Sequence, residues 1–72
     1  MSTFDAAQNA GEVLRQLIRE NYATQQDFAD EYSMDIRTVN RYINDGINKV
    51  ATIQWLAELF NVDIIRFFTP VE

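Results

Sequence analysis

The sequence predicts an all-α fold, a compact bundle of five helices in a single domain. Apolar residues recur at the three- and four-residue spacing of helices, and good capping residues border these segments. Only two glycines and one proline occur among 72 residues, which favours helices over a fold with many turns. We expect residues 1–8 to form a loosely held N-terminal arm, 9–69 the helical domain, and 70–72 a C-terminal tail.

The first helix is expected to begin at Asn9, which can act as its N-cap with Glu12 three residues further on. Its apolar residues follow the i, i+3, i+4 pattern of one core-facing stripe, namely Ala10, Val13, Leu14, Leu17 and Ile18. Arg15 and Arg19 lie one turn apart on the other side of this helix. We therefore expect both arginines at the surface.

Residues 24–46 are expected to form two short helices joined by a tight turn. Thr24 can N-cap the first helix, and Asp27 at the third helical position completes a capping box, with Asp in place of the usual Glu or Gln. Asp35 is a good N-cap for the second helix, at about residues 36–44. The buried faces are predicted to be Phe28, Ala29 and Tyr32 on the first helix and Val39, Tyr42 and Ile43 on the second.

A polar stripe lies opposite the apolar face of this second helix. It consists of Arg37, Asn40, Arg41 and Asn44. Arginine can bond guanine bidentately, and asparagine can do the same with adenine. One short helix thus offers the donors that a reader of the DNA major groove needs, with its apolar side held against the preceding helix.

The remaining helices are predicted after a loop in which Gly46 is a left-handed cap and Ile47 and Val50 fold back onto the core. The helix at about residues 50–60 is apolar on most sides, so we expect it to be central. Its Trp55 is predicted to be a core residue rather than a platform for a ligand. Asn61 is expected to end this helix in a left-handed conformation.

A last short helix, at residues 64–68, is expected to be capped by Asp63 and stopped by Pro70. So short a helix can bury Ile64 and Phe67, so we expect the additional apolar residues Ile65 and Phe68 to be exposed. A contiguous exposed apolar patch indicates a surface for a partner. Two interpretations stay open: a homodimer through this end, or packing of Phe4 against it.

The whole pattern resembles the lambda-repressor-like helix-turn-helix regulators, also called the Cro/repressor or xenobiotic-response-element family. The resemblance covers roughly residues 11–68 and is carried by Thr24-Gln25, Phe28-Ala29, Met34, Thr38-Val39, Tyr42 and Gly46. The chain departs from the family at Ser33, where glycine is usual, and at Asp35, where serine is usual. Ile18 stands where many members have an arginine near a phosphate. The resemblance implies a five-helix DNA-binding bundle with a helix-turn-helix at its second and third helices.

The resemblance also implies a function, a sequence-specific transcriptional regulator of bacterial or phage type that binds double-stranded DNA. The residues expected to contact base edges are Ile36, Arg37, Asn40 and Arg41. Those expected to contact phosphates are Gln25, Arg19, Asn44 and Lys49. Alternatives stay open for several of these residues: Ile36 packs beside Ile43, Arg19 and Gln25 are ordinary exposed residues, and Arg37, Asn40 and Arg41 are ordinary polar residues of the surface or contact adjacent phosphates.

The charge opposes DNA binding overall but not locally. The net charge is −5, which is the wrong sign for a nucleic-acid binder. Residues 36–50 nevertheless hold Arg37, Arg41 and Lys49 against Asp45 alone. Two alternatives therefore stay open: a protein-interaction module of the same fold without DNA binding, or the DNA-binding head of a longer regulator.

Other classes of function find little support in the sequence. The chain has no cysteine and no histidine, so we expect no metal site and no enzyme activity. We expect no cofactor, and no small-molecule ligand is evident. No apolar run approaches the roughly 20 residues that span a bilayer, so we expect a cytoplasmic protein without a membrane partner.

Overall fold

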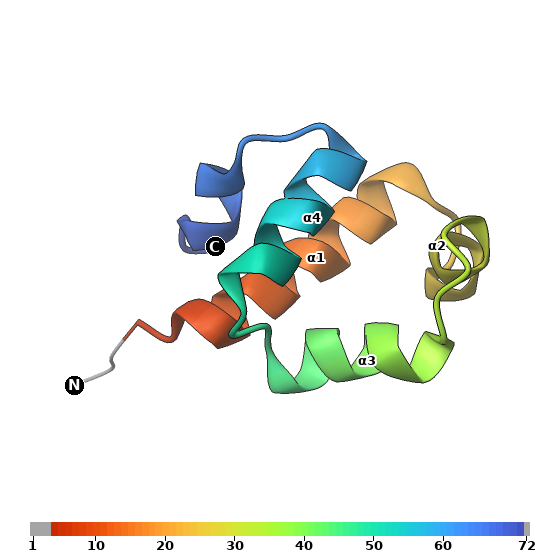
Figure 1. Cartoon of the computed structure of the whole chain (residues 1–72), viewed down its shortest axis with the longest axis horizontal. Helices are drawn as coiled ribbons and strands as arrows, with labels where there is room; N and C mark the ends of the chain where they lie inside the picture. Colours follow the sequence, from red (N-terminus) through yellow and green to blue (C-terminus); the bar gives the residue numbers. More distant parts are fainter. Residues whose placement is uncertain (1–3, 72) are drawn as a thin grey trace.

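The computed structural model describes residues 4–71 and is all-helical within that range, with no strand. The helices are α1 (Ala6–Asn21), α2 (Gln25–Glu31), α3 (Ile36–Asp45), α4 (Val50–Phe60) and the 3-10 helix η1 (Ile64–Phe68). They pack into one compact body (Figure 1). The all-α class is confirmed, whereas the last predicted helix is a short 3-10 helix, which leaves four α-helices.

Helix α1 begins at Ala6, three residues before the predicted start. Asp5 is the N-cap, and its Oδ1 accepts a 3.0 Å hydrogen bond from the Gln8 N–H. The prediction that Asn9 caps this helix is therefore wrong, and so is the predicted loose arm for residues 6–8; residues 1–3 lie outside the described part. Asn9 is instead buried within the helix.

The side chain of Asn9 attaches the C-terminal segment to α1. Its Nδ2 donates to the carbonyl oxygens of Phe67 (3.1 Å) and Thr69 (2.8 Å), and its Oδ1 accepts from the Val71 N–H (3.0 Å). Residues 70–71 are therefore attached to α1 and do not form a separate tail.

The apolar stripe of α1 faces the core, as predicted. The buried apolar residues are Ala10, Val13, Leu14, Leu17, Ile18, Phe28, Ala29, Val39, Ile43, Ile47, Ile53, Leu56, Ala57 and Phe67. An aromatic group closes one end of this core, where the rings of Phe28 and Phe60 stack with centroids 5.2 Å apart. Tyr22 and Tyr32 pack against Phe28 from the side.

Two residues of α4 lie outside the core, contrary to prediction: Trp55 is 41% exposed and Val50 is 61% exposed. Ile53, Leu56 and Ala57 fill the side of α4 that faces the interior, and Trp55 lies on the opposite side of the helix. Among residues 4–71, the backbones of α1 and η1 lie closest to α4, and α2 reaches the end of α4 through the stack of Phe28 on Phe60. These neighbours leave the side of α4 that carries Trp55 exposed.

Helix α3 lies very close to α1 because two glycines allow the approach. A Cβ on Gly11 would stand 2.4 Å from the Tyr42 carbonyl oxygen. A Cβ on Gly46 would stand 2.7 Å from the Ala7 carbonyl oxygen, which accepts a 2.9 Å hydrogen bond from the Ile47 N–H. Gly46 ends α3 at φ 92°, ψ 172°, so the positive φ was expected, but the residue is not in the left-handed helical region.

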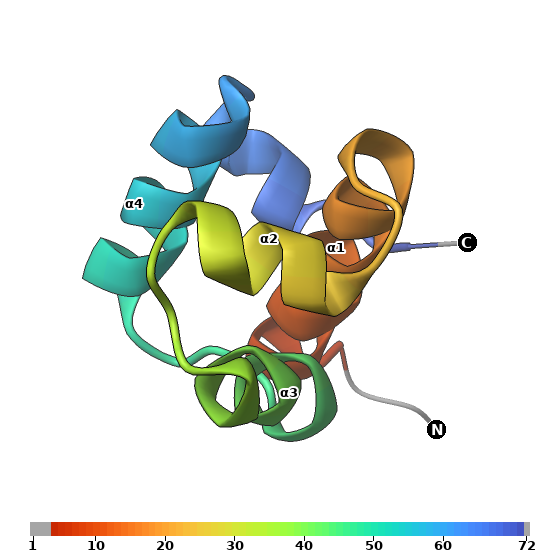
Figure 2. The ribbon, with the colours of Figure 1, turned by 90° about the vertical axis from the view of Figure 1, so that its right-hand side faces the viewer.

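Helices α2 and α3 are joined by a four-residue connection, Tyr32 to Asp35, in which Ser33 adopts φ 54°. The Met34 N–H then donates 2.8 Å to the Ala29 carbonyl oxygen and closes the turn. In Figure 1 α2 is seen nearly end-on and α3 lengthwise, and Figure 2 shows the reverse, so the two helices cross steeply. Four other predicted caps are present: the side chains of Thr24, Asp35 and Asp63 accept from the backbone N–H groups of Asp27, Arg37 and Ile65, and Asn61 is left-handed.

Candidate functional site

The exposed face of α3 is the surface that the sequence singled out. Val39 and Ile43 are 0% and 5% exposed and hold α3 against the core. The exposed side carries the predicted polar stripe, Arg37, Asn40, Arg41 and Asn44. The structure therefore brings these four side chains together on one face. Ile36 is half-buried and packs against the core.

Arg37, at the N-terminal end of this face, is paired with the cap residue Asp35. Its Nε lies 3.2 and 3.3 Å from the two Asp35 carboxylate oxygens, and its Nη2 lies 2.7 Å from Oδ2. The Arg37 backbone N–H also donates to Asp35 Oδ1 at 2.8 Å. The bonds from the Arg37 side chain and backbone lower the pKa of Asp35 to about 2, and the carboxylate raises the pKa of Arg37.

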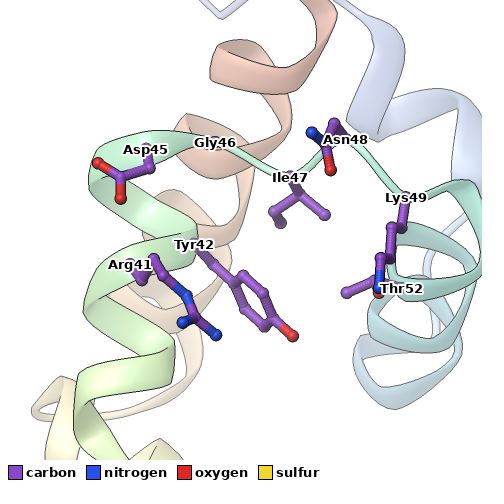
Figure 3. A pocket seen from close by; sticks show the side chains of 8 residues that line it. All are labelled: Arg41, Tyr42, Asp45, Gly46, Ile47, Asn48, Lys49 and Thr52. Atoms are coloured by element: carbon purple, nitrogen blue, oxygen red, sulfur yellow. The ribbon is translucent and has the colours of Figure 1, made fainter.

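The other end of the face opens into a hollow of about 330 Å³ between the C-terminal half of α3 and the start of α4 (Figure 3). The residues around it are Arg41, Tyr42, Asp45, Gly46, Ile47, Asn48, Lys49 and Thr52. Figure 3 shows the side chains of Arg41 and Tyr42 extending from α3, with the carboxylate of Asp45 pointing away from both.

Two cations face this hollow without an ion pair to any residue between 4 and 71: Arg41 from α3 and Lys49 from the N-cap of α4. The first turn of α4 has no acidic residue, and no side chain caps it. Free N–H groups at the start of a helix attract anions. The hollow therefore gathers positive charge in a chain whose net charge is −5.

A second, smaller hollow of about 180 Å³ brings Arg19 and Gln25 together at the junction of α1 and α2. Arg19 is exposed, whereas the neighbouring Ile18 is 2% exposed. Arg15 also borders this hollow, but its guanidinium is bound to Glu12 at 2.7 Å. The two predicted phosphate contacts on α1 and α2, Arg19 and Gln25, thus border the same hollow. Arg19 supplies a cation next to Ile18, the position at which the sequence lacks the expected arginine.

Sequence reasoning missed two features of this surface. It assigned Asp35 only a capping role, although the Asp-x-Arg spacing at a helix start allows the carboxylate to reach both the backbone and the side chain of Arg37. It also missed Asn48 and Thr52, which border the larger hollow. Their positions in the sequence, one residue before and three residues after Lys49, could have indicated that they lie near it.

No group of three or more metal-ligating side chains occurs among residues 4–71. In the same range no helix has the length and apolar character needed to cross a bilayer. The chain matches no protein-family model, no curated protein and no solved structure. The interpretation of the α3 face therefore depends on its own chemistry.

Proposed function

We propose that this chain binds double-stranded DNA as a lambda-repressor-like helix-turn-helix domain and acts as a sequence-specific transcriptional regulator. In this proposal α2 and α3 are the helix-turn-helix, η1 is the fifth helix, and α3 enters the major groove. One observation carries the proposal: Arg37, Asn40, Arg41 and Asn44 share the exposed face of a helix whose other face is buried. Forked guanidinium and amide groups are the side chains that read base edges there.

The two hollows support the proposal because they provide cationic positions on either side of the helix-turn-helix. Arg19 lies in the last turn of α1, Gln25 lies at the start of α2, and Lys49 lies beyond the end of α3. Phosphate contacts fix a protein on the duplex, while base contacts carry the sequence preference. We assign these three residues to phosphates, with Asn44 near the end of α3.

The acidic charge of the chain is compatible with the proposal because much of it lies on elements other than α3. Asp27, Asp30 and Glu31 are exposed on α2, and Glu20 is bound to Arg66 of η1 at 3.1 Å. Exposed charges are screened over about 8 Å at physiological salt, so a local cationic patch can act despite an acidic body. We expect weak binding by a single copy.

We further propose that two copies associate through η1. Ile65 is 66% exposed and Phe68 is 39% exposed on neighbouring turns of this short helix, although both are large apolar residues. A dimer would cover them and would present two α3 helices to successive major grooves, with half-sites about 34 Å apart.

The test is selection of bound duplexes from a random pool at low and moderate salt. We expect the wild-type protein to enrich one sequence pattern, and Arg41→Ala to lose much of that preference while keeping its fold by circular dichroism. Arg15→Ala is the matched control, since it removes the same charge from α1, where the guanidinium is bound to Glu12, and it should keep the preference. Failure of the wild-type protein to enrich any pattern would reject the proposal.

A protein-interaction module of the same fold is the second candidate. It is favoured by the exposed Ile65 and Phe68 together with the acidic surface of α2. A wild-type protein that selects no duplex at low salt, yet self-associates through η1, would point to this candidate.

A further inference from the structure

The pair between Asp35 and Arg37 leaves one particular edge of the guanidinium free. An arginine side chain has five N–H donors in a planar fork. Asp35 accepts from Nε and Nη2, which together form the side edge of that fork. No other hydrogen bond from the Arg37 guanidinium occurs among residues 4–71. The end edge, formed by Nη1 and the second N–H of Nη2, is therefore open.

The open end edge has the geometry that guanine recognition needs. Guanine presents two acceptors, O6 and N7, in the major groove, and two parallel N–H groups of one arginine can bond both. The side chain of Arg37 is 87% exposed, so a base edge can reach it. Asp35 holds the guanidinium through two donors without occupying the edge that a guanine would use.

The contacts of Asp35 fix its own position as well. Its Oδ1 accepts from the Arg37 backbone N–H at 2.8 Å, so the carboxylate is attached to the first turn of α3 while it binds the guanidinium. Exposed ion pairs contribute little to folding stability. The value of this pair therefore lies in orientation, because a planar fork held in one direction loses less freedom when it bonds a base.

We infer that Asp35 is a positioning residue that sets specificity: it orients Arg37 for end-on recognition of a guanine at the N-terminal end of α3. The inference rests on the proposed DNA binding and adds to it the base that Arg37 reads. It also assigns a cost to the carboxylate, which stands near the phosphates and weakens binding to DNA of any sequence. Asp35 thus lowers the affinity for DNA of any sequence and raises the preference for guanine at one position.

The experiment compares three single variants with the wild-type protein by duplex selection, followed by affinity measurements on the selected duplex, on duplexes with each guanine replaced, and on random duplex. Asp35→Asn removes the charge and keeps a good N-cap, because asparagine caps as well as aspartate. Arg37→Ala removes the fork. Asp63→Asn is the matched control, since Asp63 caps η1 through the Ile65 N–H in the same way and lies on another element.

We expect the wild-type protein to prefer guanine at one position. Arg37→Ala should lower that preference by about fivefold or more, the lower end of what one bidentate contact provides. Asp35→Asn should lower the same preference while binding random duplex more tightly, and Asp63→Asn should change neither quantity. This combination separates positioning from a structural role, because a fold defect would weaken both kinds of binding.

Two results would overturn the inference while DNA binding stands. In one, Asp35→Asn binds the selected duplex more tightly and keeps the full guanine preference. The carboxylate would then only compete with the DNA for the Arg37 guanidinium and would not orient it. In the other, Arg37→Ala leaves every base preference unchanged. Absence of any enriched duplex for the wild-type protein is a different result, and it rejects the proposed function together with this inference.

Discussion

Asn9 and Phe67 lie 58 residues apart in the sequence and are joined by a 3.1 Å hydrogen bond from Asn9 Nδ2 to the Phe67 carbonyl oxygen. The same amide also bonds Thr69 and Val71, so one buried side chain holds the segment after η1. Asn9→Ala would leave three backbone groups without these partners. We expect it to lower the free energy of unfolding by about 2–3 kcal/mol.

Urea unfolding followed by circular dichroism measures this change, and the melting temperature should fall by roughly 10–20 °C for a domain of this size. Asn44→Ala is the control, because Asn44 is exposed on α3 and should leave stability nearly unchanged. A loss below about 1 kcal/mol for Asn9→Ala would show that water replaces the amide.

Gly11→Ala tests the close approach of α1 and α3. Alanine is normally favoured over glycine inside a helix by roughly 0.5–1 kcal/mol. Here the new Cβ would stand 2.4 Å from the Tyr42 carbonyl oxygen and 3.0 Å from that of Ile43, and both belong to backbone. We therefore expect a net loss of about 1–3 kcal/mol in the free energy of unfolding.

The control for this substitution is Gln8→Ala, at an exposed position of the same helix, which should be neutral or stabilising. Denaturant unfolding of both variants decides the matter. A Gly11→Ala protein as stable as the wild type would mean that α3 is not held as closely to α1 as the structure shows.

Acid should weaken the Asp35 interactions in a defined pH window. The hydrogen bonds from the Arg37 side chain and backbone lower the pKa of Asp35 from 3.8 to about 2, so the folded state favours the ionised carboxylate. The stabilisation is therefore complete above about pH 4 and is lost as the pH falls through about 2. The stability difference between wild type and Asp35→Asn should be constant from pH 5 to pH 7 and should shrink below about pH 4.

Carbon-13 NMR titration of the Asp35 carboxyl group measures its pKa directly. Arg37→Ala should return that pKa toward its ordinary value but not reach it, because the backbone N–H of residue 37 still bonds the carboxylate. An ordinary pKa for Asp35 in the wild-type protein would show that the pair with Arg37 does not form in solution.

Features that depend on near neighbours in sequence were predicted well. The apolar stripe of α1, the caps at Thr24, Asp35 and Asp63, and the left-handed Asn61 all follow from residues within about one helical turn. The clustering of Arg37, Asn40 and Arg41 on one face of α3 follows from the helical period alone.

Features that depend on distant partners were not predicted. Asparagine is a residue type that favours the N-cap position, but the partners of the Asn9 side chain are Phe67, Thr69 and Val71. No local sequence pattern indicates these distant partners. Trp55 was predicted to be in the core because α4 is apolar on most sides, yet how much of a helix is buried depends on how many neighbours pack against it. The ion pair of Arg37 depends on a side-chain rotamer, which sequence spacing permits without specifying.

Self-association through η1 is testable by sedimentation equilibrium. We expect the wild-type protein to dimerise at high micromolar concentration and Ile65→Glu to remain monomeric, because a charge would be buried in the interface. Since Ile65 is 66% exposed, this variant should fold normally as a monomer. Val50→Glu, at a similarly exposed apolar position on α4, should still dimerise. A strictly monomeric wild-type protein would remove the dimer from the proposal.

Lys49 and Arg41 border the same hollow, yet they should affect DNA binding differently. Lys49 lies off the α3 face, so Lys49→Ala should weaken binding to all duplexes alike and reduce the slope of log affinity against log salt by about 0.9. Arg41→Ala should reduce discrimination between selected and random duplexes by about 1–3 kcal/mol. Fluorescence anisotropy titrations at several salt concentrations measure both quantities. If Lys49→Ala altered base preference while Arg41→Ala changed only the salt slope, the two assignments would have to be exchanged.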